Sequence, residues 1–378
     1  MIKNTPPMGW NSWNTFGSDI NEDLIRETAD ALVSSGLKDA GYEYVVIDDC
    51  WSLKERDKNG RLQADPEKFP SGMKALADYI HSKGLKFGMY SCAGNSTCAG
   101  YPGSHDHEFI DAETFAEWEV DYLKYDYCFH AGISFGEYLY RRMSIALEGC
   151  GRDILFSACT WGTDETHKWI KTTNSSVWRS TGDIYDSWAS VTDLLRSQTE
   201  KFPYAGRGCF NDMDMLVVGM HGEGNVGLGG CTYEEYKAHF SAWAFLASPL
   251  MIGCDIRNMD EETKSILTKK ELIKINQDIC ATQPWMVHKT WHGNRGVMIY
   301  ARILSGGDIG LCIVNTSDSD QLCNFTFDEL SLPMSTNKTL SLREVWTDEV
   351  EFTPNNTYIK SIPAHTCKVY RCKVINIR

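Results

Sequence analysis

Aspartate residues close apolar runs at two places in the first third of the sequence. Asp48 and Asp49 end the run at residues 44–49, and Asp126 ends the run at residues 120–126. Each run follows a segment with helical periodicity, and repeated helix–strand units predict a parallel sheet whose strands end at one shared face. Carboxylates at that face would converge on one site, where they could act as acids, bases or nucleophiles.

Eight short apolar segments are the candidates for the strands that position these acids. The helices predicted before them cover residues 24–33, 73–80 and the region around 115–118. Gly36 and Gly84 supply the stops of the first two helices. The strand candidates are residues 8–10, 44–47, 85–90, 120–126, 154–159, 177–180, a short piece before residue 211, and 250–252. Eight is the number of strands that closes a (β/α)8 barrel, the TIM barrel fold.

After about residue 285 the pattern changes to alternating strands with polar turns and no helix of useful length. The strand candidates there are residues 297–300, 311–314, 340–342 and 368–371. Such a pattern is typical of a compact antiparallel β-sandwich. The sequence therefore predicts an α/β protein with a barrel domain over residues 1–284 and an all-β sandwich domain over residues 285–378.

Composition limits the kinds of partner. The chain has 378 residues, a formal net charge of -14 and a pI near 5.2. A polyanion is repelled at long range by such a chain, so neither nucleic acid nor an anionic membrane is expected as the main partner. A neutral substrate and a homo-oligomer are both compatible with these values.

Apolar stretches and cysteines bear on the location of the protein. The longest nearly apolar stretch, residues 242–253, is too short to span a bilayer, and the amino terminus lacks the apolar core of a signal peptide. The 14 cysteines form no CxxC pair, and many lie in apolar runs, which favours free thiols and a reducing compartment. We expect a cytoplasmic, bacterial protein, or a secreted one whose signal peptide was removed. Cys98 and Cys128 follow two successive strand ends and could form a disulfide there.

Several motifs in order carry a resemblance to a known family. They are MGWNSW at 8–13, IDDCW at 47–51, CAGYPGS at 98–104, KYD at 124–126, WR at 178–179 with GDI at 182–184, NDMDM at 211–215 and INQD at 275–278. This series resembles the α-galactosidase and α-N-acetylgalactosaminidase family, glycoside hydrolase family 27. The resemblance runs over roughly the first 280 residues. The β-sandwich predicted after them is also of the kind expected for this family.

The resemblance implies a retaining glycosidase that needs no cofactor and no metal. Such enzymes place two carboxyls about 5 to 5.5 Å apart, one as nucleophile and one as general acid and then base. By resemblance Asp126 is the nucleophile and Asp183 is the acid/base. Lys124 lies two residues before Asp126, on the same side of the strand, and should favour an ionised Asp126. Arg179 stands close to Asp183 in sequence, so burial or repulsion between the carboxyls must keep the general acid protonated.

The resemblance also implies a sugar-binding set around these acids. Asp48 and Asp49 would hold the O4 and O6 side of a galactose-type ring, and both remain Asp, which favours a hexose over an L-arabinopyranoside. The aromatic residues expected to supply a flat apolar surface for the ring are Trp10, Tyr90 and Trp161. Arg179 and Asp214 resemble positions that contact the substrate near O2 or the reacting centre.

The substituent at C2 of the sugar is the main open point. The resemblance assigns the C2 pocket to Thr160 and Thr163, whereas α-galactosidases usually carry a larger polar residue at the first position. Two small hydroxyl residues leave room for an acetamido group, but Trp161, Gly162 and Asp164 resemble microbial α-galactosidase loops. We rank α-galactosidase above α-N-acetylgalactosaminidase, and a substrate with a terminal α-galactose-type sugar is expected.

Two further classes of protein fit parts of the pattern. A metal-dependent hydrolase would combine a histidine with Asp48, Asp49, Asp212 and Asp214. A non-catalytic galactose-binding protein would keep the pocket on a decayed barrel, but no expected catalytic carboxylate is missing. An aspartate at a strand end can also merely cap the next helix, and His105 and His107 in a polar loop are more often solvated than metal-bound.

Overall fold

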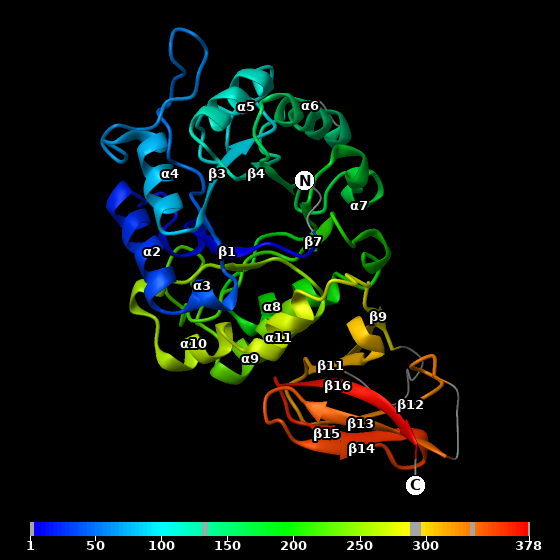
Figure 1. The fold of residues 1–378 in the computed structure, drawn as a ribbon. Coiled ribbons are helices and arrows are strands. Elements are labelled where there is room, and N and C mark those ends of the chain that lie inside the picture. The colour runs from blue at the N-terminus through cyan, green and yellow to red at the C-terminus, as the bar shows by residue number, and fades with distance from the viewer. Residues whose placement is uncertain (1–3, 131, 133–134, 288–295, 333–336, 377–378) are drawn as a thin grey trace.

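Eight parallel strands form a barrel in the N-terminal part of the chain (Figure 1). The protein is described from a computed structural model that covers residues 4–130, 132, 135–287, 296–332 and 337–376. The strands are β1 Met8–Asn11, β2 Tyr44–Val46, β3 Lys86–Cys92, β4 Tyr122–Asp126, β5 Leu155–Cys159, β6 Val177–Arg179, β7 Phe210–Asp212 and β8 Leu250–Ile252. All eight strands overlap the predicted segments or lie where they were expected. The predicted TIM barrel is confirmed.

Sequential pairing from β1 to β7, together with the β1–β8 pair, leaves only the junction of β7 and β8 to be closed. The segment after β7 closes it at Leu216, whose backbone N–H donates to the Met251 carbonyl at 2.7 Å. The Leu216 carbonyl in turn accepts from the N–H of Gly253 at 3.0 Å. The loop that follows β7 is therefore held against the end of β8.

One row of paired residues crosses the carboxyl ends of five strands. It runs through Cys92, Asp126, Cys159, Arg179 and Asp212, from β3 to β7. Parallel pairing of neighbouring strands fixes this row, so the two carboxylates and the guanidinium start from neighbouring backbone positions.

Seven side chains fill the barrel interior below that row. They are Tyr44, Val46, Tyr122, Leu155, Val177, Met215 and Met251, and each is at least nine-tenths buried. The barrel is thus a packed core, as is usual for this fold, and chemistry is confined to its ends.

Helices surround the barrel (Figure 1). They are α1 Trp13–Phe16, α2 Glu22–Ser34, α3 Leu37–Ala40, α4 Gly72–Ser82, α5 Glu108–Glu117, α6 Gly136–Gly149, α7 Thr166–Trp169, α8 Trp188–Arg196, α9 Tyr233–Phe245, α10 Glu261–Leu267 and α11 Lys270–Asn276. The three helices predicted from periodicity correspond to α2, α4 and α5. Several other helices begin with a side-chain cap. At the start of α9, for example, Thr232 and Glu235 form a capping box.

The C-terminal part is an antiparallel β structure of two sheets. The strands are β9 Trp285–Met286, β10 Val297–Ile303, β11 Ile309–Asn315, β12 Gln321–Thr326, β13 Lys338–Glu344, β14 Val350–Phe352, β15 Thr357–Ile362 and β16 Cys367–Asn376. The larger sheet has the order β14-β13-β16-β11-β10-β9, and β12 pairs with β15. Buried residues of both sheets, including Leu311, Phe325 and Tyr358, share one core. The predicted sandwich is confirmed.

Helix α9 joins the two parts of the chain. It packs against β11 and β16 as well as against the helices of the barrel. Arg302 is fully buried at this junction and donates from Nη1 to the Phe245 carbonyl at 3.0 Å, and Trp346 Nε1 donates to Ser241 Oγ at 3.0 Å. The sandwich is therefore fixed to the barrel by polar contacts inside an apolar interface.

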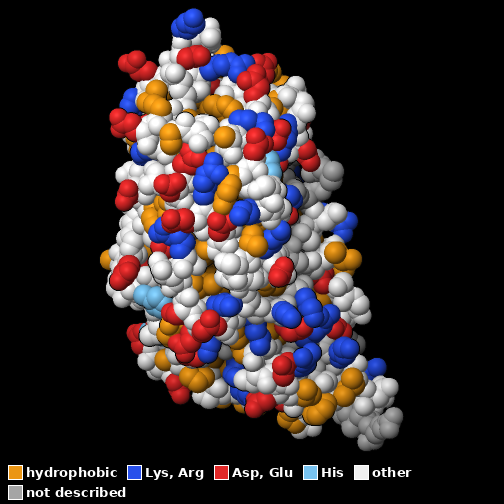
Figure 2. Space-filling model, turned by 60° about the vertical axis from the view of Figure 1, so that its left-hand side comes forward, with side chains coloured by type: hydrophobic (Ala, Val, Ile, Leu, Met, Phe, Trp, Pro, Cys, Tyr) orange, Lys and Arg blue, Asp and Glu red, His pale blue; other side chains and the backbone are white. Residues whose placement is uncertain are grey.

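The surface carries charges of both signs. On the face in Figure 2, acidic and basic side chains are interspersed, and apolar side chains lie between them singly or in small groups. Within the described part of the chain, no helix has the length and apolar character needed to cross a membrane.

Candidate active site

Asp126 ends β4 and is 7% exposed. Its Oδ2 accepts a hydrogen bond from the Tyr90 hydroxyl at 2.9 Å, and its Oδ1 accepts from the Tyr127 N–H at 3.0 Å. Burial raises the pKa of Asp126 to about 6, while the charge of Lys124 and the two hydrogen bonds act in the opposite direction. Asp126 is therefore a buried carboxylate that is still mainly ionised at neutral pH.

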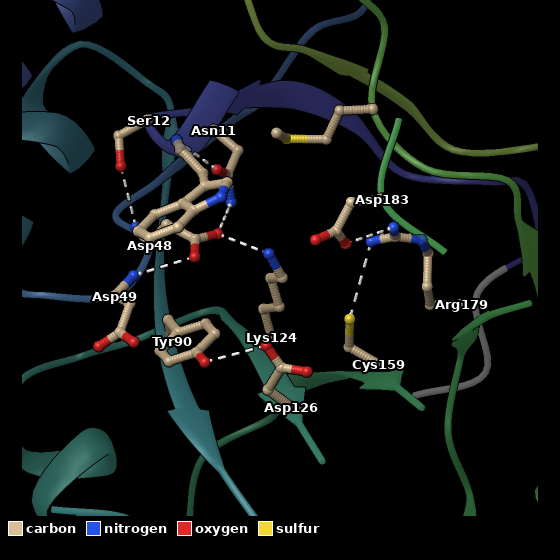
Figure 3. A network of polar contacts seen from close by, with 12 residues as sticks. Asn11, Ser12, Asp48, Asp49, Tyr90, Lys124, Asp126, Cys159, Arg179 and Asp183 are labelled. Atoms are coloured by element: carbon tan, nitrogen blue, oxygen red, sulfur yellow. Dashed lines mark hydrogen bonds and ion pairs between the residues drawn. The ribbon is translucent and has the colours of Figure 1, made fainter. Parts of the chain in front are cut away.

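Lys124 forms its ion pair with Asp48 and only a longer-range interaction with Asp126. Its Nζ lies 2.8 Å from Asp48 Oδ2, and the same oxygen accepts from Asn11 Nδ2 at 2.7 Å (Figure 3). The Asp48 N–H donates to Ser12 Oγ at 3.0 Å. Although burial opposes it, the negative charge of Asp48 raises the pKa of Lys124, so this lysine is a permanent cation.

Asp49 is held by the backbone of two loops. Its Oδ1 accepts from the Cys50 N–H at 2.7 Å and its Oδ2 accepts from the Ala99 N–H at 3.1 Å. Burial raises the pKa of Asp49 despite these bonds. Cys98, next to Ala99, forms a disulfide with Cys128, with a Cα–Cα distance of 5.3 Å. The disulfide joins the loops after β3 and β4, next to both Asp49 and Asp126.

Arg179 organises the opposite side of the site. Its Nη2 lies 2.7 Å from Asp214 Oδ2 and 2.9 Å from Asp183 Oδ1. Asp214 is 8% exposed at its side chain, whereas Asp183 is 62% exposed. Asp214 also has a φ of 84°, which is rare outside glycine and indicates backbone held by its surroundings. In Figure 3, Asp183 and Arg179 lie across from the pair formed by Asp48 and Lys124.

The loop after β5 is tightly folded. Trp161, Gly162, Asp164 and Glu165 all have positive φ values, between 46° and 77°. A Cβ on Gly162 would lie 2.4 Å from the Ser180 carbonyl oxygen, so only glycine allows this loop to approach the end of β6 so closely. Clustered strained residues at the end of a barrel strand are typical of a functional loop.

Comparison with known proteins agrees with this geometry. Residues 5–278 match the family model described as alpha galactosidase A, and residues 294–372 match the alpha galactosidase C-terminal β-sandwich domain. The α-galactosidase of Cyamopsis tetragonoloba is 45% identical over 97% of this chain and 85% of its own length. The chain belongs to the α-galactosidase family, glycoside hydrolase family 27.

Solved structures of this family superpose on nearly the whole chain. The crystal structure of α-galactosidase I from Mortierella vinacea gives a TM-score of 0.90 at 36% identity, covering 98% of this chain and 97% of that one. The structure of the α-galactosidase from Saccharomyces cerevisiae with raffinose gives 0.88 at 30% identity, covering 98% of each. The barrel and the sandwich are therefore both family features.

The three aromatic residues predicted as a sugar surface differ in accessibility within this α-galactosidase-family site. Trp10 is completely buried, and its Nε1 donates to the Cys254 carbonyl at 2.9 Å. Tyr90 is 2% exposed and uses its hydroxyl on Asp126, while Trp161 is partly buried. Their contact with a sugar stays a prediction, and Tyr90 has a second role as the hydrogen-bond donor to Asp126.

Thr160 and Thr163, predicted to line the C2 pocket, also differ. Thr160 is fully buried, and its hydroxyl lies 2.5 Å from that of Thr166. Thr163 is exposed, and its hydroxyl donates to the Thr160 carbonyl at 2.7 Å. Both hydroxyls are thus engaged within the loop, and their role toward C2 stays a prediction.

Asn11, Ser12 and Cys159 had no role predicted from the sequence, and Asp212 was considered only as a metal ligand. Asn11 and Ser12 position Asp48, and Asp212, whose pKa burial raises to about 6, accepts the Asp214 N–H at 2.9 Å. Cys159 lies with its Sγ 3.9 Å from Arg179 Nη1. The available signal was their place at the strand ends, in the same motifs as the acids.

The arrangement of the carboxylates does not fit the hypothesis of a metal-dependent hydrolase. Asp48 is already paired with Lys124, and Asp214 with Arg179. Among the described residues, the groups of three close ligand side chains are Cys98 with Asp126 and Cys128, and Asp78 with His81 and Glu119. The first contains the disulfide, and neither matches the predicted carboxylate set.

Proposed function

We propose that this chain is an exo-acting, retaining α-galactosidase that removes terminal α-D-galactose by double displacement. The observation that carries the proposal is the buried carboxylate of Asp126 at the end of β4, with a second carboxylate, Asp183, held by Arg179 across the site. Family membership supports the same activity. Two carboxyls that flank one sugar are what retaining hydrolysis requires.

In the first step, Asp126 attacks the anomeric carbon and Asp183 protonates the departing glycosidic oxygen. A covalent β-galactosyl ester forms at Asp126 while the bond to the leaving group breaks. In the second step, Asp183 takes a proton from water, and the water oxygen displaces Asp126 from the sugar. The Tyr90 hydroxyl orients the attacking carboxylate, because its 2.9 Å bond fixes Oδ2.

Asp183 must carry its proton when the next substrate binds, so that it can protonate the leaving group. The carboxyl is 62% exposed, and its Oδ1 lies 2.9 Å from Arg179 Nη2. A sugar seated over Asp126 would cover Asp183 and exclude water, and the negative charge of Asp126 would repel a second carboxylate. We propose that substrate binding itself prepares the acid.

Recognition of the sugar is assigned to the opposite wall. Asp48 and Asp49 are fixed acceptors for the hydroxyls on the O4 and O6 side of galactose. An ammonium has three donors, so Lys124 can bond Asp48 and still donate to a sugar hydroxyl. Arg179 and Asp214 form the wall near O2 and the reacting centre.

The proposal is tested by comparing substrates. We expect kcat/KM on nitrophenyl α-galactoside to exceed that on the α-N-acetylgalactosaminide and on the β-L-arabinopyranoside by at least about tenfold. Activity should survive EDTA. A higher kcat/KM on the α-N-acetylgalactosaminide would favour the second candidate activity, α-N-acetylgalactosaminidase. Binding of galactose without release of nitrophenol would instead indicate a non-catalytic binding protein.

Thr160→Glu tests the C2 pocket. We expect the ratio of N-acetylgalactosaminide to galactoside activity to fall by about tenfold, because a longer side chain would fill space for the acetamido group. Thr199→Glu, at an exposed position in the turn after α8, is the matched control. A folded Thr160→Glu variant with an unchanged ratio would remove Thr160 from the pocket.

The roles of the two domains, the natural substrates and the location of the protein are also proposals. We propose that catalysis resides in residues 1–284, with 285–378 as a supporting sandwich, and that the substrates are oligosaccharides with terminal galactose, in line with the raffinose complex of the yeast relative. Nucleic acid and membrane are not expected partners. Twelve of the 14 cysteines are free, which supports a cytoplasmic location, whereas the disulfide of Cys98 and Cys128 is more typical of an oxidising compartment.

A further inference from the structure

Three large side chains are exposed in the segment that leads from β4 into α6. Phe129 is 62% exposed, Phe135 is 71% exposed and Tyr138 is 54% exposed. Single exposed aromatic residues are ordinary, but three within ten residues directly after the nucleophile strand form a group. This segment leaves the carboxyl end of β4, where Asp126 lies.

A cavity of about 530 Å³ lies at two of these residues. Its lining is Phe135, Glu137, Tyr138, Arg141, Asp164 and Trp169. The volume is in the range of small-molecule sites, and three aromatic rings with a few charged groups are the usual lining of such a site. The two acids and one arginine leave little net charge, which suits a neutral ligand with hydroxyl groups.

The walls of the cavity are fixed by hydrogen bonds. Asp164 Oδ2 accepts the N–H of Gly136 at 2.6 Å, and the Asp164 carbonyl accepts from Trp169 Nε1 at 2.7 Å. A Cβ on Gly136 would lie 2.8 Å from the Trp169 ring, so glycine lets the indole pack against the start of α6. Glu137 is held by Arg141 at 2.7 Å. The site is built before any ligand arrives.

A row of aromatic side chains links this cavity to the nucleophile. Tyr127 follows Asp126 directly, and its ring lies 5.9 Å from the ring of Tyr140. The Tyr140 ring in turn lies 5.9 Å from that of Trp169 in the cavity wall. Burial and the charge of Asp164 raise the pKa of Tyr127 to about 12. Asp164 also belongs to the loop after β5 that carries Thr160. The cavity therefore lies at the same end of the barrel as Asp126, next to the segments that follow β4 and β5.

We propose that this cavity is a subsite for the sugar units of the aglycone, beyond the glycosidic bond that is cleaved. Pyranose rings present C–H faces that pack on aromatic rings, and Phe135, Tyr138 and Trp169 offer such rings, while Glu137, Arg141 and Asp164 can bond hydroxyls. The subsite rests on the proposed function, because it needs galactose seated over Asp126. It gives the enzyme a preference for oligosaccharide galactosides over short ones.

The test varies the length of the aglycone. α-Galactosyl fluoride has no aglycone sugar, whereas melibiose, raffinose and stachyose have one, two and three. Tyr138→Ala, and the double variant Phe135→Ala with Tyr138→Ala, should lower kcat/KM on raffinose and stachyose by about fivefold or more and leave the fluoride within about twofold. Phe352→Ala, at a phenylalanine on β14 that is 58% exposed, is the matched control and should change neither.

Each other outcome overturns the subsite. Equal losses on the fluoride and on stachyose would mean a structural effect on the catalytic centre, and no loss on stachyose would mean that the cavity does not meet the aglycone. A change in sedimentation on Tyr138→Ala would make the aromatic group a contact between copies of the chain. Failure of the wild-type chain to hydrolyse the fluoride would instead overturn the proposed function.

Discussion

Asp126→Ala should reduce turnover of α-galactosides by a factor on the order of 10⁴ or more, since no other group can form the glycosyl ester. The loss should not come from unfolding. The folded state disfavours the ionised carboxyl, because burial raises the pKa of Asp126 to about 6. Above the pKa of the unfolded carboxyl this costs stability, so at pH 7 the variant should unfold at the same temperature as the wild type or higher.

Azide provides the stereochemical check on Asp126→Ala. A small anion can enter the space left by the carboxylate and attack the sugar from the same side. With an activated substrate we expect partial recovery of rate and a β-galactosyl azide as product. An α-galactosyl azide would contradict the nucleophile role, and Asp183→Ala, which keeps Asp126, should not yield the β-azide.

Much of the barrel could be predicted because its strands are short apolar runs between helices with clear periods. Helices α2 and α4 have an apolar face against the barrel and a polar face toward water, so their period is visible, whereas α5 also buries Glu108 and Asp111. Helix α9 was not predicted, because ten of its thirteen residues are buried between the barrel and the sandwich. A helix covered on all sides has no polar stripe from which a period can be read.

The strand-end acids were also predictable, but their partners were not. Lys124 was expected to act on Asp126, yet its ammonium bonds Asp48, which is 76 residues away in the chain. Periodicity tells which side of β4 Lys124 faces, but the choice between two carboxylates depends on the register of β2, β3 and β4. Such contacts between distant strands cannot be read from local sequence.

Two cations, the partly buried Lys124 and the buried Arg179, balance the acids of this site. Lys124 serves Asp48 and lowers the pKa of Asp126, whereas Arg179 bonds Asp214 and Asp183. Each cation thus joins a group assigned to sugar binding to a group assigned to catalysis. Replacing one cation should therefore alter sugar binding, the pKa of the catalytic carboxyl and the stability of the protein together. The structure gives the direction of each change.

Lys124→Met should have the largest combined effect. It leaves Asp48 buried without its ion pair, and breaking a buried pair at one partner costs about 3–5 kcal/mol of unfolding free energy. Removal of the ammonium also takes away a charge that lowers the pKa of Asp126. The acid limb of the kcat/KM profile, expected near pH 6 in the wild type, should therefore move up by about one pH unit.

The sign of the lysine's own titration separates these effects. The folded pKa of Lys124 is raised, so its contribution to stability is fully present below its unfolded pKa and is lost only at alkaline pH. A change of the activity profile between pH 5 and 8 then comes from carboxyls whose pKa Lys124 lowers, among them Asp126, the proposed nucleophile, and Asp212. Lys124→Arg keeps the charge and should restore the acid limb toward pH 6 more than it restores KM.

Lys86→Met is the matched control for the buried position. Lys86 pairs with Glu43 at 2.7 Å, but the two side chains are 37% and 43% exposed, so its loss should cost no more than about 1 kcal/mol and leave the pH profile unchanged. An acid limb that stays near pH 6 in Lys124→Met would mean that the lysine does not act on the nucleophile. The assignment of Lys124 as the link between Asp48 and Asp126 would then be wrong, whatever the loss of stability.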